Sequence, residues 1–290
     1  MNFLYKTYYQ LGFVPFDGLD SLNCLYKSIR YVKVPQGKWY ADPFLFSVND
    51  DCFVVLVEEF RYDRPIGRIA KLEIDRATMQ IRKEVILLEL PSHLSFPIFY
   101  RRGNDVYVYP ENSSSGGLKL YKYDLQAEQL IYVKTLVNRP LVDAVMINCK
   151  GKDYIFATDN NERGGNGNLL RIYESNDTDR FDEFQTCELP LCYARSAGSI
   201  IGINDKLIRV AQDCTYSYGR NLVFQEVHYD ENKGFSFETI KTVVPRFPQK
   251  GIHTFNICEN WAVIDVYYDY FPFLRKIYFI IRHYLKIFSH

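Results

Sequence analysis

Apolar and polar residues alternate along this chain in a unit that occurs five times. Each unit contains a short apolar strand, a polar turn rich in Asn, Asp, Gly and Lys, and a second apolar strand. Such turns between apolar runs are typical of tight β-hairpins. The pattern therefore predicts five hairpins, which start roughly 46 to 56 residues apart at Asp42, Phe96, Val142, Ser196 and Ile252.

Two further alternating segments follow each of the first four hairpins. After the first hairpin they are "GRIAKLEID" and "QIRKEVILLEL", and after the second they are "LKLYKYD" and "LIYVKTLV". Four antiparallel strands per unit, repeated radially, describe the blades of a β-propeller. We therefore predict an all-β fold, a five-bladed β-propeller. A pair of stacked β-sandwiches is the alternative, but it explains the regular spacing less well.

The fifth unit is short, because no further strand pair follows Tyr267. We expect residues 3–33, in and around "NFLYKTYY" and "YKSIRYVKVP", to supply the missing outer strands and to close the ring. Ring closure removes the exposed edges that an open array of blades would leave. The predicted organisation is a propeller over residues 1–269, followed by a C-terminal amphipathic helix over residues 270–290.

The C-terminal segment has a pattern of its own. Residues 271–288 are apolar and aromatic with four interleaved basic residues, and the apolar positions follow helical spacing. A basic amphipathic helix of this kind suits an anionic membrane surface, but it carries too much charge to span a bilayer. A helix packed on the propeller or at a dimer interface is the alternative.

Composition narrows the classes of partner and the compartment. Lys+Arg and Asp+Glu balance at 35 each, so no basic field is present to hold nucleic acid. The seven cysteines form no C-x-x-C pair and no histidine stands at metal-ligand spacing, so we expect no metal site and no cofactor. Free cysteines and the lack of an evident signal peptide predict a cytoplasmic protein, peripheral at the inner face of a membrane if the C-terminal helix binds there.

Polar residues open the first strand of several units. In a propeller these strands line the centre, so their opening residues meet at one mouth; they are Asp42, Phe96-Pro97, Asp143, Ala197-Gly198 and His253. The second strands of the first four units end on polar residues as well, among them Glu111 and Gln212-Asp213. Each acid alone reads equally well as a turn or cap residue, but the recurrence favours a shared pocket. Paired carboxylates in a cleft are the machinery of glycosidic chemistry.

The motifs around these positions resemble a known family. "ADPFLF", "ARSAG" with "KLIRVAQDCTYSYG", and "GIHTFN" are similar to the propeller domain at the N-terminus of glucosamine inositolphosphorylceramide transferase, over about residues 38–267. More distantly, "ADPF" resembles the first-blade signature of the five-bladed furanosidase-type glycoside hydrolases. In those hydrolases the acids that open the first three inner strands act as base or nucleophile, as pKa modulator and as general acid.

Carried over by position, the hydrolase resemblance gives an incomplete acid set. Asp42 matches the first acid, Phe96-Pro97 occupies the second position, and Asp143 stands where a glutamate is expected. Glu111, at the end of the neighbouring strand, is the residue that could compensate. The catalytic candidates are therefore Asp42, Glu111 and Asp143.

The "ARSAG…RVAQD" segment supplies most of the candidate binding residues. Arg195 and Arg209 could hold a phosphate or carboxylate through forked hydrogen bonds, although Arg209 could equally pair with an acid inside the propeller. His253 is either an acid–base group or a hydrogen-bonded structural residue. The full set of predicted substrate-binding residues is Arg195, Arg209, Gln212, Asp213, Tyr218, His253 and His93.

Taken with the resemblance, these residues predict a carbohydrate-active protein of surface-glycan or glycolipid biosynthesis. The expected role is glycosyl transfer or acceptor binding at the central pocket, with a glycan, a sugar nucleotide or a lipid-linked acceptor as ligand. A furanosidase-like glycoside hydrolase is one alternative. A non-catalytic glycan-binding or scaffold module that serves a partner glycosyltransferase is the other.

Overall fold

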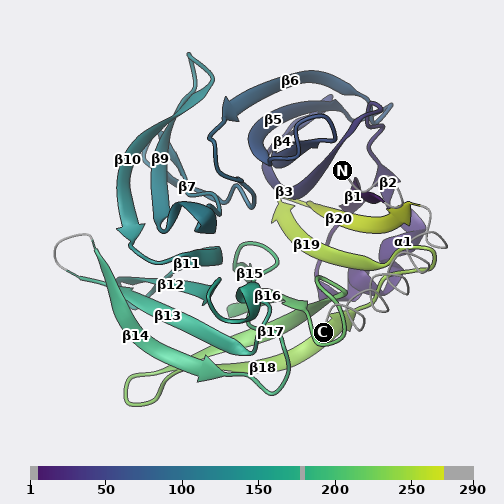
Figure 1. The fold of residues 1–290 in the computed structure, drawn as a ribbon. Coiled ribbons are helices and arrows are strands. Elements are labelled where there is room, and N and C mark those ends of the chain that lie inside the picture. Colours follow the sequence, from purple (N-terminus) through teal and green to yellow (C-terminus); the bar gives the residue numbers. More distant parts are fainter. Residues whose placement is uncertain (1–5, 177–179, 271–290) are drawn as a thin grey trace, which may run out of the picture.

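The computed structural model describes residues 6–176 and 180–270. Their strands form five four-stranded antiparallel sheets that are arranged around a common centre (Figure 1). The predicted five-bladed β-propeller is therefore confirmed. Residues 271–290, on which the predicted C-terminal helix falls, lie outside the described residues.

The first four blades follow one another along the chain. Blade 1 consists of β3 (Lys38–Val48), β4 (Cys52–Arg61), β5 (Arg68–Asp75) and β6 (Ile81–Leu88). Blade 2 consists of β7 (Phe99–Arg102), β8 (Asp105–Val108), β9 (Leu118–Asp124) and β10 (Gln129–Val137). Blade 3 consists of β11 (Leu141–Cys149), β12 (Lys152–Asp159), β13 (Leu169–Ser175) and β14 (Phe181–Glu188). Blade 4 consists of β15 (Ile201–Ile203), β16 (Lys206–Asp213), β17 (Asn221–Asp230) and β18 (Gly234–Val243).

The fifth blade joins the two ends of the described chain. It consists of β19 (Gly251–Cys258), β20 (Trp261–Tyr270), β1 (Lys6–Pro15) and β2 (Arg30–Tyr31), in that order across the sheet. β1 pairs with β20 along its whole length, so the N-terminal strands supply the outer half of this blade. The ladder between the first and last strands holds the ring closed and leaves β20 without a free edge.

Among the described residues, helical structure is limited to short segments. These are η1 (Leu19–Cys24), α1 (Leu25–Ser28), η2 (Ser113–Ser115) and η3 (Arg163–Gly165). Within the described part of the chain, no helix has the length and apolar character needed to cross a membrane.

The core lies between the faces of neighbouring blades, where aromatic side chains interlock. Phe44 of blade 1 meets Phe96 of blade 2 edge to face at 4.8 Å between ring centroids. Phe13 of blade 5 stacks on Phe53 of blade 1 at 4.2 Å. Aromatic pairs of this kind contribute about 0.5–1.5 kcal/mol beyond the area they bury. The high Phe and Tyr content therefore serves blade-to-blade packing first.

The strands nearest the centre share a distortion close to their starts. The ladders of β3, β11 and β19 each contain one residue more than the partner strand there, beginning at Asp42, at Asp143 and at His253. Asp42, Phe96 and Asp143 adopt positive φ angles of 49°, 47° and 45°, a conformation that L-residues rarely take. Bulges of this kind re-aim side chains and are frequent beside functional sites. In this protein they direct the strand-opening residues toward the centre of the ring.

Candidate functional site

One mouth of the propeller contains a cavity of about 380 Å³. All five blades contribute to its wall, blades 1 and 5 through their strands and blades 2, 3 and 4 mainly through their loops. Six of the residues predicted from the sequence lie in this wall: Asp42, His93, Glu111, Arg195, Tyr218 and His253. They span more than 200 positions of the chain, so their convergence depends on the propeller alone.

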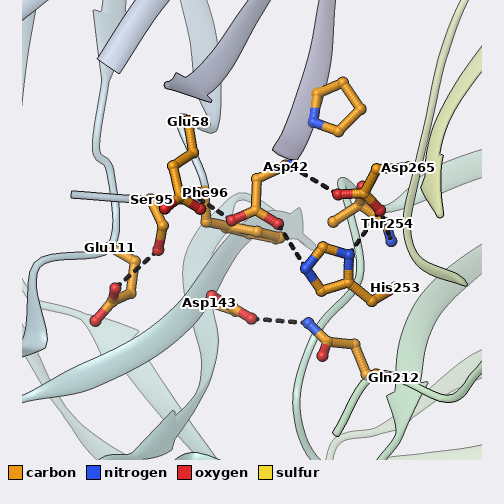
Figure 2. Close-up of polar contacts among 12 residues, drawn as sticks. Asp42, Glu58, Ser95, Phe96, Glu111, Asp143, Gln212, His253, Thr254 and Asp265 are labelled. Atoms are coloured by element: carbon orange, nitrogen blue, oxygen red, sulfur yellow. Dashed lines mark hydrogen bonds and ion pairs between the residues drawn. The ribbon is translucent and has the colours of Figure 1, made fainter. Parts of the chain in front are cut away.

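A buried chain of charged groups forms the floor of the cavity between blades 1 and 5 (Figure 2). His253 Nδ1 lies 2.6 Å from Asp265 Oδ1, and its Nε2 lies 3.5 Å from Asp42 Oδ1. Asp265 also accepts hydrogen bonds from the backbone amides of Asp42, at 2.8 Å, and of Thr254, at 3.0 Å. The other oxygen of Asp42 accepts one from the amide of Phe96 at 3.1 Å. Asp265 thus fixes both the histidine ring and the backbone that carries Asp42.

The environment of the cavity floor raises the pKa of both His253 and Asp42. Burial alone would lower the pKa of His253, but Asp265, Asp42 and Asp143 outweigh it and raise the pKa to about 9. Burial raises the pKa of Asp42 well above its ordinary range, and the neighbouring carboxylates add to this while His253 opposes it. Both ring nitrogens of His253 face carboxylate oxygens, an arrangement that favours the imidazolium form at neutral pH.

Asp42, His253 and Asp265 could also hold a cation, because one ligand atom from each lies within 4.8 Å of the others. A metal needs an unprotonated histidine nitrogen. Here both nitrogens of His253 are turned toward carboxylates, and its pKa of about 9 favours the proton at neutral pH. The geometry therefore fits a proton-holding site better than a metal centre.

Asp143 occupies the same strand position as Asp42 but meets a permanent cation. Its Oδ2 accepts hydrogen bonds from Arg195 Nε at 2.6 Å and from Gln212 Nε2 at 2.9 Å (Figure 2 shows the second). Burial raises the pKa of Asp143, and Arg195 opposes the rise. Arg195 stands in the cavity wall in front of the carboxylate and also donates to Asn166 Oδ1 at 3.1 Å.

Two more acids face the cavity from the ends of second strands. Glu111 accepts the hydroxyl of Ser95 at 2.9 Å and the amide of Ser113 at 2.7 Å. Glu58 lies 3.1 Å from His93 Nε2, while His93 Nδ1 accepts the amide of Gly67 at 3.0 Å. That second bond requires an unprotonated Nδ1, so the ring proton of His93 is on Nε2, which faces Glu58.

Aromatic rings form the rest of the wall. Trp39 stacks on Phe60 at 4.5 Å, and Tyr9 lies 4.7 Å from Trp39 and 5.0 Å from His253. On the opposite side, the guanidinium of Arg195 lies 4.8 Å from the centroid of the Tyr218 ring. The site therefore combines flat apolar faces with carboxylates and a guanidinium.

The structure corrects two of the predicted binding residues. Arg209 lies outside the cavity wall: its guanidinium donates to the carbonyls of Tyr193 and Ala194 and to Gln225 Oε1. Arg209 does not face the cavity, and it forms no salt bridge with an acid in the described part of the chain. Burial lowers the pKa of Arg209 to about 9. Asp213 instead caps a turn, accepting the amide of Thr215 at 2.9 Å and Asn221 Nδ2 at 2.7 Å.

The reason for both corrections is the alternation of side chains in β16. Successive residues of a strand point to opposite faces of the sheet. Gln212 faces Asp143 behind the cavity wall, so Arg209 and Asp213, at odd-numbered offsets from it, face the other way. The sequence pattern already contained this information.

The sequence interpretation also missed several residues of the site: Tyr9, Trp39, Glu58, Phe60 and Asp265. Asp265 had a detectable signal, because a lone acid inside the apolar run "WAVIDVY" needs a buried partner. Glu58 was visible only as one of several acids at strand ends. Tyr9 gave no signal, because its place depends on how β1 closes the ring.

Comparison with known sequences finds a family that covers most of the chain. Residues 25–266 match the family model described as glucosamine inositolphosphorylceramide transferase 1, N-terminal. The enzyme of that name from Oryza sativa subsp. japonica is 26% identical over 198 residues, which are 64% of this chain and 26% of the enzyme. The Arabidopsis thaliana enzyme is 28% identical over 193 residues, which are 63% and 24%. The chain thus spans about a quarter of the length of the curated relatives it matches.

Several solved structures share the propeller. An α-L-arabinofuranosidase from Clostridium thermocellum has a TM-score of 0.53 at 15% identity, over 77% of this chain and 80% of that protein. An exo-β-1,3-galactanase from Phanerochaete chrysosporium has a TM-score of 0.53 at 7% identity, over 74% and 54%. At these identities the likeness establishes the fold.

Proposed function

The chain belongs to the family of the N-terminal domain of glucosamine inositolphosphorylceramide transferase 1, and from this premise we propose that its central cavity binds the acceptor sugar for a glycosyl transfer in surface-glycan or glycolipid synthesis. The observation that carries the proposal is the composition of one wall. Stacked aromatic faces, carboxylates and a guanidinium surround a cavity of about 380 Å³, a volume within the usual range for small-molecule sites.

Each part of the wall suits a part of a sugar. The Trp39–Phe60 pair and Tyr9 offer flat apolar surfaces for the C–H face of a sugar ring. Glu58 and Glu111 accept hydrogen bonds from hydroxyl groups, and Arg195 donates them. His93 lies against one oxygen of Glu58, and Ser95 and Ser113 donate to the two oxygens of Glu111, so the protein fixes the orientation of both carboxylates toward the ligand.

Asp42 is the group best placed to take a proton from an acceptor hydroxyl. Its raised pKa makes the carboxylate a stronger base than an ordinary aspartate, and His253 beside it stabilises the charged form. In this role Asp42 Oδ1 accepts the hydroxyl proton while the hydroxyl oxygen forms the new glycosidic bond. The donor's leaving group departs with the electron pair of the bond that breaks.

Hydrolysis of the furanosidase type is less well supported by the same geometry. It needs a second carboxyl group free to protonate the leaving oxygen. The second strand position presents the Phe96 amide, which already donates to Asp42, and Asp143 is held by Arg195 and Gln212. Glu111 is the acid left for that role, and both of its oxygens accept protein hydrogen bonds.

Tryptophan fluorescence provides a direct test. The chain has two tryptophans; Trp39 lies in the cavity wall, and Trp261 packs on Phe53 at 4.9 Å. Trp261→Phe leaves Trp39 as the only reporter, to be titrated with neutral, acidic and amino sugars, their nucleoside diphosphates and aryl furanosides. We expect saturable quenching that Asp42→Asn weakens and that the exposed control Asp63→Asn leaves unchanged.

The reaction products distinguish the remaining functions. Product that forms only with a nucleotide sugar and an acceptor supports transfer. Release of the aryl group from a furanoside, lost in Asp42→Asn, would replace the proposal with hydrolysis. A lack of response to every saccharide would reject a sugar site in this cavity.

A further inference from the structure

The mouth side of the propeller carries unusually exposed apolar side chains. Phe247 is 91% exposed, Tyr216 is 83% exposed and Val244 is 60% exposed. They belong to two loops, residues 214–220 between β16 and β17 and residues 244–250 between β18 and β19. Large apolar side chains held in water at the tips of neighbouring loops commonly mark an interaction surface.

Both loops border the cavity. Tyr218, two residues after Tyr216, lies in the cavity wall. The backbone carbonyl of Tyr218 accepts a hydrogen bond from the hydroxyl of Tyr267 at 2.6 Å. The amide of Ile252 donates to the carbonyl of Arg220 at 3.3 Å, which ties the first loop to the start of β19 beside His253. The second loop leads directly into that strand.

The tip that carries Phe247 is held by hydrogen bonds. The amide of Arg246 donates to Gln249 Oε1 at 3.0 Å, and the amide of Gln249 donates to the carbonyl of Arg246 at 2.8 Å. Gln249 Nε2 donates to the hydroxyl of Tyr31 at 2.7 Å. These hydrogen bonds fix the turn in a conformation that exposes the phenyl ring of Phe247 to solvent.

The charged residues in these two loops are all basic. The two loops contain Arg220, Arg246 and Lys250 and no Asp or Glu, whereas acids and bases balance over the whole chain. None of the three cations forms a salt bridge with another described residue. Between the loops lies a hollow of about 600 Å³ lined by Tyr216, Arg220 and Val244 among others, large enough for a phosphate headgroup.

We infer that this tip surface, formed by Tyr216, Val244, Phe247, Arg220, Arg246 and Lys250, docks on an anionic lipid bilayer. Isolated aromatic tips ringed by basic residues match the chemistry of a bilayer interface, where rings enter the headgroup boundary and cations meet phosphates. Each basic residue near an anionic leaflet strengthens binding about fivefold.

Docking in this way turns the mouth of the cavity toward the bilayer. If the proposed function holds, the sugar it takes is then one carried on a lipid. The membrane inference itself needs only the tip surface, so it can be tested without any saccharide.

The first experiment is vesicle flotation of the full chain. We expect recovery with phosphatidylcholine vesicles that contain about one third phosphatidylserine, and loss of that recovery without phosphatidylserine or at about 0.5 M salt. The double variant Tyr216→Ser/Phe247→Ser should bind at least about tenfold more weakly. Leu125→Ser, at a 54% exposed leucine in the β9–β10 turn, is the matched control and should bind like the unmodified protein.

The second experiment separates these loops from any other segment that binds lipid. In a Trp39→Phe/Trp261→Phe background, Phe247→Trp should be quenched by lipids brominated in their acyl chains, whereas Leu125→Trp should remain unquenched. Any one of three results would overturn the inference: the full chain does not float with the vesicles, the double variant floats as well as the unmodified protein, or the tryptophan of Phe247→Trp is not quenched. Normal saccharide binding by the double variant keeps a failure here distinct from a failure of the proposed function.

Discussion

Asp42 and Asp143 occupy the same place in two blades and yet have different chemistry. Both follow the first residues of an innermost strand, both have a φ near 45–49°, and both are buried. Asp143 lies against Arg195, a cation at every working pH. Asp42 lies against His253, a cation that can lose its proton.

The difference shows that a structural repeat need not repeat its chemistry. Arg195 balances Asp143 permanently, so this pair acts as a fixed wall that offers a guanidinium to a ligand. Asp42 shares its surroundings with Asp265 and a titratable ring, so this group can exchange a proton with a ligand. Changes to each pair should therefore affect different properties of the protein.

The largest expected effect is on stability, at the blade 3 pair. Asp143→Asn leaves the Arg195 guanidinium buried without its carboxylate, which typically costs about 3–5 kcal/mol. Urea unfolding measures this loss. Adding Arg195→Met in the same chain should recover part of it, because the uncompensated charge is then removed. A loss below about 1 kcal/mol for Asp143→Asn would mean that the pair is solvated.

The next largest effect is a pH dependence of the free energy of unfolding, which we expect from His253 in blade 5. The pKa of His253 is raised to about 9 from its ordinary 6.5, so its contribution to stability is complete below about pH 6.5 and disappears as the pH rises through about 9. The loss should be on the order of 3 kcal/mol. The other groups that face the ring are Asp42, Asp265, Tyr9 and Tyr218, and burial raises the pKa of both tyrosines well above 10.

His253→Gln provides the control for this pH dependence. The difference between the unfolding free energies of the two proteins should shrink steadily between about pH 7 and pH 10. A constant difference over that range would show that His253 is neutral in the folded protein.

Much of this arrangement could be predicted from the sequence because it follows from repetition. Regular hairpin spacing specified five blades, and the first strand of each blade had to face the centre. Asp42, Asp143 and His253 could therefore be expected at one mouth from the sequence. The C-terminal helix remains a prediction, because its residues lie outside the described part of the chain.

The partners of those residues could not be predicted in the same way. The hydrogen bond from the Asp42 amide to Asp265 joins positions 223 residues apart, across the seam where the ring closes. Nothing in the local sequence marks Phe96 for a positive φ, since it is neither Gly nor Asn. Arg209 is a different case, because the two-residue alternation of β16 would have excluded it.

A smaller change in stability is expected when the Asp42 carboxyl is replaced. After Asp42→Asn the buried His253 still has Asp265 as its ion-pair partner, so the free energy of unfolding should change by less than about 1 kcal/mol near neutral pH. The asparagine oxygen can still accept the Phe96 amide. Saccharide affinity or turnover should nevertheless fall strongly, which separates this residue from Asp143. A stability loss as large as that of Asp143→Asn would show that Asp42 is a second structural ion-pair partner.

The smallest effect is expected at the outer pair of the same cavity. His93 has a side chain that is 45% exposed, and its Nε2 faces Glu58, in contrast to the buried ring of His253. His93→Gln keeps a donor for Glu58, so the free energy of unfolding should change by less than about 0.5 kcal/mol. His93→Ala removes the donor and leaves Glu58 free to turn, which should weaken saccharide binding a few-fold in the Trp39 titration. Equal affinities for the alanine and glutamine variants would show that Glu58 needs no donor from this side of the cavity.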